Sequence, residues 1–170
     1  MKRSSRGEEG PEEVGADVGV EHHAGLGLVA DDPADVHAPL TERVLADTAR
    51  YPEWNPFIRK LDGPLVAGGR IAATIQPLGR RAMTFRPTLL RVDPERELRW
   101  LGRFVVRGLF DGEHVFRLVP EGSGTRLIHE ELFGGFLLRF MDIETFRPSF
   151  EAMNDALKTR VETLAMSIAL

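Results

Sequence analysis

The C-terminal segment from about Thr145 to Ile168 constrains the fold more than any other part of the sequence. Apolar residues recur there at steps of three and four, which places them on one face of an α-helix. The opposite face carries charged residues such as Glu151 and Asp155. A helix this long and one-sided needs a large apolar partner. The residues of its apolar face are Phe146, Phe150, Met153, Leu157, Val161, Leu164 and Ile168.

Most of the chain before this helix has the pattern of β-strands. Six runs of strand-forming residues follow one another, and turn residues bound each run. Short turns such as Glu121–Gly124 separate them, so neighbouring runs are expected to pair antiparallel. A helix over Pro39–Ala49 and a tight turn or single helical turn over Tyr51–Phe57 come first. The predicted strands are Ile58–Leu61, Arg70–Gln76, Met83–Val92, Glu97–Val106, Gly112–Val119 and Thr125–Phe133.

This order of elements predicts an α+β fold in which a curved antiparallel sheet wraps the C-terminal helix. We expect a pocket between the sheet and the helix. A short first strand is expected within Leu26–Val36, where Asp31, Asp32 and Pro33 interrupt the pattern. The 170-residue length fits one domain. We place that domain at residues 25–170, after a Gly- and Glu-rich tail at residues 1–24 whose composition is typical of disorder.

Composition excludes several classes of function. The net charge of −4 argues against a nucleic-acid surface, which needs clustered Lys and Arg. The absence of cysteine excludes disulfides, thiolate metal sites and cysteine nucleophiles. No run approaches the ~20 apolar residues of a membrane span, so we expect no integral membrane segment and a cytoplasmic location. The histidines at 22, 23 and 37 lack the spacing of a metal site, and no cofactor or metal is predicted.

Several local strings resemble the START-like helix-grip (SRPBCC) superfamily in its polyketide cyclase/dehydrase branch. They are Tyr51–Phe57, Leu98–Gly102, Gly112–Phe116, Glu131–Gly134 and Met153–Lys158, and the resemblance spans roughly residues 40–165. It implies the helix-grip fold, a curved antiparallel sheet of about seven strands around the long C-terminal helix. It also implies a cavity for apolar small molecules. Upstream of Leu40 the match fades, because the expected alternating strand and its aromatic partner are not recognisable there.

The last two predicted strands carry a candidate polar pair. If they pair across the Glu121–Gly124 loop with Pro120 opposite Thr125, then Phe116 faces His129 and His114 faces Glu131. A one-residue slip would turn His129 and Glu131 outward instead. In an apolar cavity, His114 and Glu131 can act as general acid and base on a carbonyl compound. Alternatively, the pair is simply satisfied or orients a ligand.

The candidate ligand-binding residues are mostly aromatic, and many of them can equally be plain core. Phe110 and the loop from Phe136 to Met141 lie beside glycines and are the best candidates for a mobile gate. The full set of candidates is Trp54, Phe57, Trp100, Phe104, Phe110, His114, Phe116, His129, Glu131, Phe133, Phe136, Phe140, Phe150, Met153, Asn154 and Leu157.

Three functions compete. The first is a binding or carrier protein for an apolar small molecule such as a lipid, an aromatic compound or a polyketide. The second is a cyclase or aromatase that uses His114 and Glu131. The third is a chaperone-activator-like interaction module, which predicts a filled core and an exposed apolar patch. The first two predict a cavity. The expected partner is an apolar ligand, with no nucleic acid and no integral membrane, and the chain is expected to be a monomer or homodimer.

Overall fold

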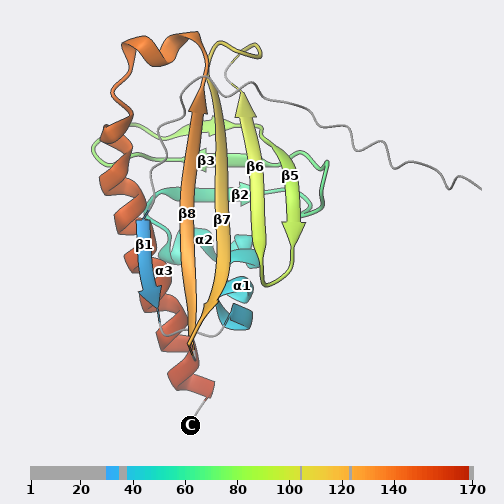
Figure 1. Ribbon diagram of the computed structural model, residues 1–170, viewed down its shortest axis with the longest axis vertical. Helices are drawn as coiled ribbons and strands as arrows, with labels where there is room; N and C mark the ends of the chain where they lie inside the picture. The colour runs from blue at the N-terminus through green and yellow to red at the C-terminus, as the bar shows by residue number, and fades with distance from the viewer. Residues whose placement is uncertain (1–29, 35–37, 104, 123, 169–170) are drawn as a thin grey trace, which may run out of the picture.

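A computed structural model of the protein (Figure 1) describes residues 30–34, 38–103, 105–122 and 124–168. The predicted tail at residues 1–24 lies outside these residues. Among the described residues, five strands form one antiparallel sheet in the order β1-β8-β7-β6-β5. Their bounds are β1 Ala30–Ala34, β5 Thr88–Asp93, β6 Glu97–Arg103, β7 Asp111–Glu121 and β8 Gly124–Gly134.

Three further strands form a second, smaller sheet in the order β2-β3-β4, with bounds Ile58–Asp62, Ala72–Ile75 and Met83–Phe85. Figure 1 shows β2 and β3 running across the direction of β7 and β8. The single strand predicted over Met83–Val92 is therefore wrong: its halves, β4 and β5, lie in different sheets. Pro87 lies at the break, where a residue without an N–H cannot continue a strand ladder.

Three helical segments lie between β1 and β2. Helix α1 spans Ala38–Ala46, the 3-10 turn η1 spans Thr48–Arg50 and the one-turn helix α2 spans Tyr51–Trp54. The Tyr51 hydroxyl donates to the Leu45 carbonyl at 2.7 Å. The Asn55 side-chain oxygen accepts from the backbone N–H groups of Phe57 and Ile58 at 2.9 and 2.8 Å. These bonds hold the turn that starts β2, and the predicted helical turn at this position is confirmed.

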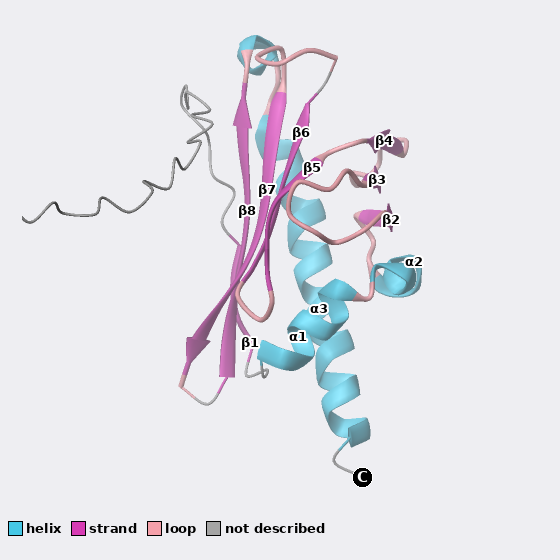
Figure 2. Cartoon of the chain, turned by 90° about the vertical axis from the view of Figure 1, so that its right-hand side faces the viewer, coloured by secondary structure: helices cyan, strands magenta, loops and turns pink. Residues whose placement is uncertain are grey.

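The chain ends with the 3-10 turns η2 (Phe136–Phe140) and η3 (Ile143–Phe146) and the helix α3 (Arg147–Ile168). Figure 2 shows α3 running along one face of the five-stranded sheet, with the small sheet on the same side. The helix buries Phe150, Met153, Leu157 and Val161, as the spacing predicts. Ile168 is instead 64% exposed. Ile168 is the last residue of α3, and the C-terminal end of this helix extends beyond the sheet (Figure 2).

The first strand expected within Leu26–Val36 is confirmed in part by β1, which pairs antiparallel with β8 from Ala30 opposite His129 to Ala34 opposite Thr125. The arrangement as a whole is the predicted α+β helix-grip fold, with the strands divided between two sheets rather than joined in one. The long helix and the two sheets leave space between them, and this space positions the site.

Candidate ligand pocket

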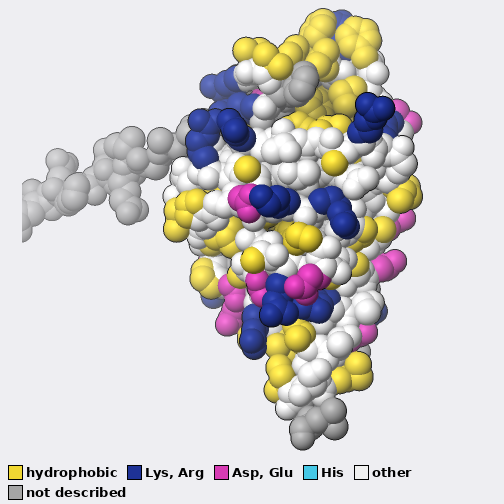
Figure 3. Space-filling view, turned by 180° about the vertical axis from the view of Figure 1, so that it is seen from behind, with side chains coloured by type: hydrophobic (Ala, Val, Ile, Leu, Met, Phe, Trp, Pro, Cys, Tyr) yellow, Lys and Arg dark blue, Asp and Glu magenta, His cyan; other side chains and the backbone are white. Residues whose placement is uncertain are grey.

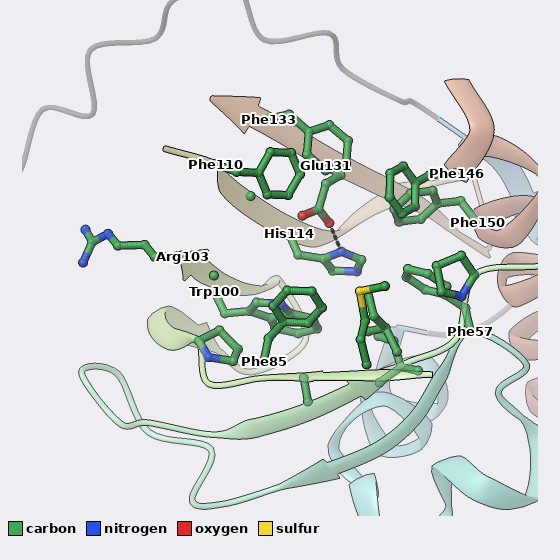
Figure 4. Close-up of a pocket in the computed structure, with 18 of the residues that line it drawn as sticks. Phe57, Phe85, Trp100, Arg103, Phe110, His114, Glu131, Phe133, Phe146 and Phe150 are labelled. Atoms are coloured by element: carbon green, nitrogen blue, oxygen red, sulfur yellow. Dashed lines mark hydrogen bonds and ion pairs between the residues drawn. The ribbon is translucent and has the colours of Figure 1, made fainter. Parts of the chain in front are cut away.

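A cavity of about 290 Å³ lies between the two sheets and the start of α3. Its wall draws on both sheets, on η2 and η3 and on Phe150 of α3 (Figure 4). Four lining residues have side chains that carry charge or can titrate: His114 and Glu131 in the interior, and the exposed Arg80 and Arg103. Most of the others are apolar. Seven of the residues proposed from the sequence line this cavity: Phe57, Trp100, Phe110, His114, Glu131, Phe133 and Phe150.

The pairing of β7 with β8 places the two titratable groups side by side. Pro120 lies opposite Thr125, Phe116 opposite His129 and His114 opposite Glu131, so the predicted register is confirmed. Figure 4 shows the carboxyl group of Glu131 directed at the imidazole ring of His114. His114 Nδ1 and Glu131 Oε2 are hydrogen-bonded.

The hydrogen bonding continues inward from this pair to α3. His114 Nε2 lies 3.0 Å from His129 Nε2, and His129 Nδ1 lies 2.8 Å from Asn154 Oδ1. Both ring nitrogens of each histidine are therefore used. His129 and Asn154 are 0% and 4% exposed, so the inner part of this chain is shielded from solvent. We call Glu131, His114, His129 and Asn154 the polar chain.

Aromatic rings surround the polar chain and decide its charge. The Trp100 ring stacks on His114 with centroids 4.5 Å apart and an angle of 8° between the planes. Phe150 contacts both histidines, at 5.6 Å from His114 and 4.4 Å from His129. Burial lowers the pKa of His114 to about 3. Burial, and then the neighbouring His114, lower the pKa of His129 well below its usual range, while the bond to Asn154 opposes this shift. Both rings are neutral at pH 7.

Glu131 is neutral for the same physical reason. Burial raises the pKa of Glu131 to about 8, because an apolar environment penalises the carboxylate. The side chain nonetheless keeps 13% of its surface exposed and lines the cavity, so a ligand can reach it. The second carboxyl oxygen, Oε1, lies over Gly112, where an added Cβ would stand only 2.6 Å away. Glycine at this position therefore leaves room for the carboxyl group.

The other candidates from the sequence lie away from the cavity surface. Phe116, His129, Met153, Asn154 and Leu157 are buried behind it. Trp54 is partly buried and contacts the Tyr51 ring edge-on at 5.2 Å. Phe136 and Phe140 are 58% and 72% exposed and face outward. Phe104 lies outside the described residues.

Sequence reasoning missed the part of the wall that comes from the small sheet. Ile58, Ala73, Ile75, Met83 and Phe85 line the cavity from β2, β3 and β4. Their pairings are antiparallel, and Pro87 turns the chain from this sheet toward the other. The alternation of apolar residues in these short strands predicts that one face of each strand is buried. It does not predict which element packs against that face.

Exposed apolar residues of η2 and of the loop before β7 form a rim beside the part of the cavity that Leu137 and Met141 line. Hydrophobic side chains gather at this end of the molecule (Figure 3). Arg139 lies over the rings of Phe136 and Phe140, 4.3 and 5.4 Å from their centroids. We define the rim cluster as the exposed residues Val105, Val106, Phe136, Arg139 and Phe140. Backbone bonds from Phe136 and Leu137 to Gly108 and Leu109 tie η2 to the loop before β7.

The described residues contain no group of three or more His, Asp or Glu arranged to hold a metal ion. Within the same residues, no helix has both the length and the apolar character needed to cross a membrane.

Comparison with models of protein families shows which family the chain belongs to. The model of the family described as polyketide cyclase / dehydrase and lipid transport matches residues 34–162. The chain belongs to this family. Membership supports a ligand-binding or cyclase role in general, and the family description covers both. A comparison with curated proteins found no significant match.

Solved structures of similar fold agree with this family. A protein from Nitrosomonas europaea is 21% identical with a TM-score of 0.65, covering 85% of this chain and 97% of that one. Major latex-like protein 151 from Panax ginseng is 8% identical with a TM-score of 0.66, covering 80% and 97%. The di-domain ARO/CYC StfQ of the steffimycin biosynthetic pathway is 11% identical with a TM-score of 0.60, covering 85% and 52%. At these identities the likeness shows the fold alone.

Proposed function

We propose that this member of the polyketide cyclase / dehydrase and lipid transport family binds a compact apolar small molecule in the cavity between its sheets and α3. The observation that carries the proposal is the cavity itself, about 290 Å³ in volume and lined mainly by aromatic and aliphatic side chains. Burying apolar ligand surface there contributes about 25 cal/mol per Å² before the costs of binding. The cavity also favours a pocket function over an interaction module, for which a filled core was predicted.

Native mass spectrometry of protein purified from its own host tests this proposal. We expect a co-purified apolar molecule that is lost on partial denaturation. The matched control is the Gly102→Leu variant. Gly102 lines the cavity, and an added Cβ meets nothing closer than 3.7 Å, so leucine can extend into the cavity without a clash at its base. Equal amounts of the same molecule on both proteins would place it outside the cavity and contradict the proposal.

A second candidate function is catalysis, which the contact between His114 and Glu131 at the cavity wall favours. The His114–Glu131 pair can act as general acid and base on a bound carbonyl compound, as a cyclase or dehydratase step requires. Glu131→Gln removes the transferable proton and keeps the shape of the carboxyl group, and His114→Ala removes its partner. For an enzyme, each change is expected to lower kcat at least about a hundredfold. Turnover retained in both variants would end the catalytic proposal and leave binding as the function.

A further inference from the structure

The geometry of the polar chain determines which atom donates and which accepts in each of its hydrogen bonds. The assignment starts from Asn154 on α3. The Asn154 side-chain oxygen only accepts hydrogen bonds, so His129 Nδ1 donates the proton of their 2.8 Å bond. A neutral imidazole has one donor and one acceptor nitrogen, and His129 Nε2 is therefore the acceptor. His114 Nε2 must then donate across the 3.0 Å contact. This leaves His114 Nδ1 as an acceptor, and Glu131 Oε2 must carry a proton to bond with it.

The reverse order is disfavoured by the orientation of the Asn154 amide. It needs that amide turned so that its nitrogen donates to His129, whereas Oδ1 is the atom that lies 2.8 Å from His129 Nδ1. In the reverse order His114 Nδ1 would donate to Glu131 Oε2, which would accept either as a carboxylate or as the carbonyl oxygen of an acid protonated on Oε1. An apolar site penalises the carboxylate, and the amide orientation selects the first order over the remaining neutral form.

The first order leaves a single free polar atom of the chain at the cavity wall. Both nitrogens of His114 are used, and Oε2 of Glu131 donates to His114. Oε1 of Glu131 is the carbonyl oxygen of a neutral acid, and it lies over Gly112 at the cavity surface. It can accept a hydrogen bond and cannot donate one. The charged groups that line the same cavity, Arg80 and Arg103, are exposed, and Figure 4 shows Arg103 pointing away from Glu131.

We propose that Asn154, acting through His129 and His114, holds Glu131 as a neutral acid whose Oε1 accepts a hydrogen bond from an uncharged hydroxyl group of the ligand. This inference rests on the proposed function, because it assigns the chemistry of the molecule in the same cavity. The ligand class is an apolar ring or chain that carries a phenol or alcohol group. Glu131 contacts the ligand, and Asn154 and His129 are positioning residues.

Long-range proton–nitrogen NMR at pH 6.5 tests the order of protons without a ligand. Variants in which one histidine is replaced by glutamine assign the signals. We expect His129 as the Nδ1–H tautomer and His114 as the Nε2–H tautomer. Asn154→Leu removes the acceptor and is expected to release His129 from its tautomer, and Asn154→Asp restores an acceptor and the wild-type tautomer. The opposite tautomers in wild type, or unchanged tautomers in Asn154→Leu, would overturn the role of Asn154.

Fluorescence titrations with three probes test the ligand class. The probes are 2-naphthol, 2-methoxynaphthalene, which lacks the donor, and the apolar dye N-phenyl-1-naphthylamine. We expect 2-naphthol to bind about fivefold tighter than 2-methoxynaphthalene, the ratio for one neutral hydrogen bond. Glu131→Leu abolishes this preference. Glu131→Gln is expected to keep the preference for 2-naphthol that Glu131→Leu loses, because the amide nitrogen donates to His114 and the amide oxygen still accepts from the ligand.

The outcomes separate the two proposals. Equal binding of 2-naphthol and 2-methoxynaphthalene by wild type, while the dye binds, overturns the hydroxyl assignment and leaves the proposed function standing. Loss of the preference in Glu131→Gln shows that Glu131 acts as a carboxylate and also overturns the assignment. Failure of all three probes to bind contradicts the proposed function, and the NMR result then still decides the order of protons. Circular dichroism confirms that each variant is folded.

Discussion

At the inner end of the pocket, His114 and His129 are 3% and 0% exposed and every ring nitrogen has a partner. At the rim, Phe136 and Phe140 are more than half exposed, and Arg139 lies over their rings in solvent. The inner end is fixed by packing and hydrogen bonds, so it can set which ligand is accepted. The rim side chains make their contacts in solvent, which suits passage of a ligand rather than recognition.

The largest difference between the inner end of the pocket and the rim is expected in the free energy of unfolding. Phe150→Ala empties a site that contacts Phe57, His114 and His129, and it should cost about 3–5 kcal/mol. The matched rim variant Phe140→Ala should change the free energy of unfolding by less than about 1 kcal/mol, because that ring is 72% exposed and loses only exposed contacts. Urea denaturation measures both. Similar losses in the two variants would mean that the inner end is no better packed than the rim.

The polar chain should also give stability an unusual dependence on pH. The ordinary pKa of histidine is 6.5, so His114 and His129 become protonated below this pH in the unfolded chain but stay neutral in the folded protein. The free energy of unfolding therefore falls as the pH drops below 6.5. Folded Glu131, with its pKa of about 8 against an ordinary 4.5, keeps a proton that the unfolded chain releases. Its contribution is complete below pH 4.5 and is lost as the pH rises to about 8.

The net maximum for these three groups lies at about pH 6.5, since the two histidines outweigh Glu131 below that value. Above it, stability should fall by up to about 1.4 kcal/mol per pH unit until the pH reaches about 8. Denaturation of wild type and Glu131→Gln across pH 5–9 measures this slope. The variant should lack the decline above pH 6.5. An identical alkaline decline in both proteins would show that Glu131 is not the group responsible.

A smaller effect is expected at the glycines of the wall. Gly112→Ala places a Cβ 2.6 Å from Glu131 Oε1 and should cost about 1–3 kcal/mol while moving the carboxyl group. Gly102 lies opposite Gly112 in the β6–β7 ladder and is the matched control. A Cβ added at Gly102 would stand 3.7 Å from the nearest atom, the carbonyl oxygen of Gly112. Gly102→Ala should be neutral or slightly stabilising. Thermal melts decide the comparison, and equal shifts in the two variants would argue against the close approach of Glu131.

The smallest effect is expected at the rim. Arg139→Gln removes two exposed cation–π contacts, worth about 0.5–1 kcal/mol in all. The Kd for N-phenyl-1-naphthylamine should change less than about twofold, because Arg139 does not line the cavity. Urea denaturation and fluorescence titration measure the two quantities. A loss of stability comparable with that of Phe150→Ala would make the rim part of the core.

The parts of this fold that sequence predicted are those set by short-range rules. The four-residue turn fixed the register of β7 on β8, and with it the contact of His114 with Glu131. The spacing of apolar residues located α3, and it was wrong at Ile168 because spacing cannot say where the sheet ends. The break at Pro87 escaped prediction because a proline is compatible with both a bulge and a strand end.

The inner half of the site was harder to predict. Asn154 and His129 were proposed as ligand-binding residues, yet they bond to each other behind the cavity wall. Sequence placed His129 on the inward face of β8, but its partner lies on a helix 25 residues away. The neutral state of Glu131 follows from its burial, and its partner His114 packs against Trp100 and Phe150. No local sequence pattern specifies this tertiary packing.

The most direct test of ligand binding between the sheets and α3 is a fluorescence titration of N-phenyl-1-naphthylamine into wild type, Gly102→Leu and Gly134→Leu. Leucine at 102 extends into the cavity, whereas a side chain at Gly134 meets open space away from the lining. We predict saturable binding to wild type and Gly134→Leu, and at least about tenfold weaker binding to Gly102→Leu. Equal affinity for all three proteins would contradict the account.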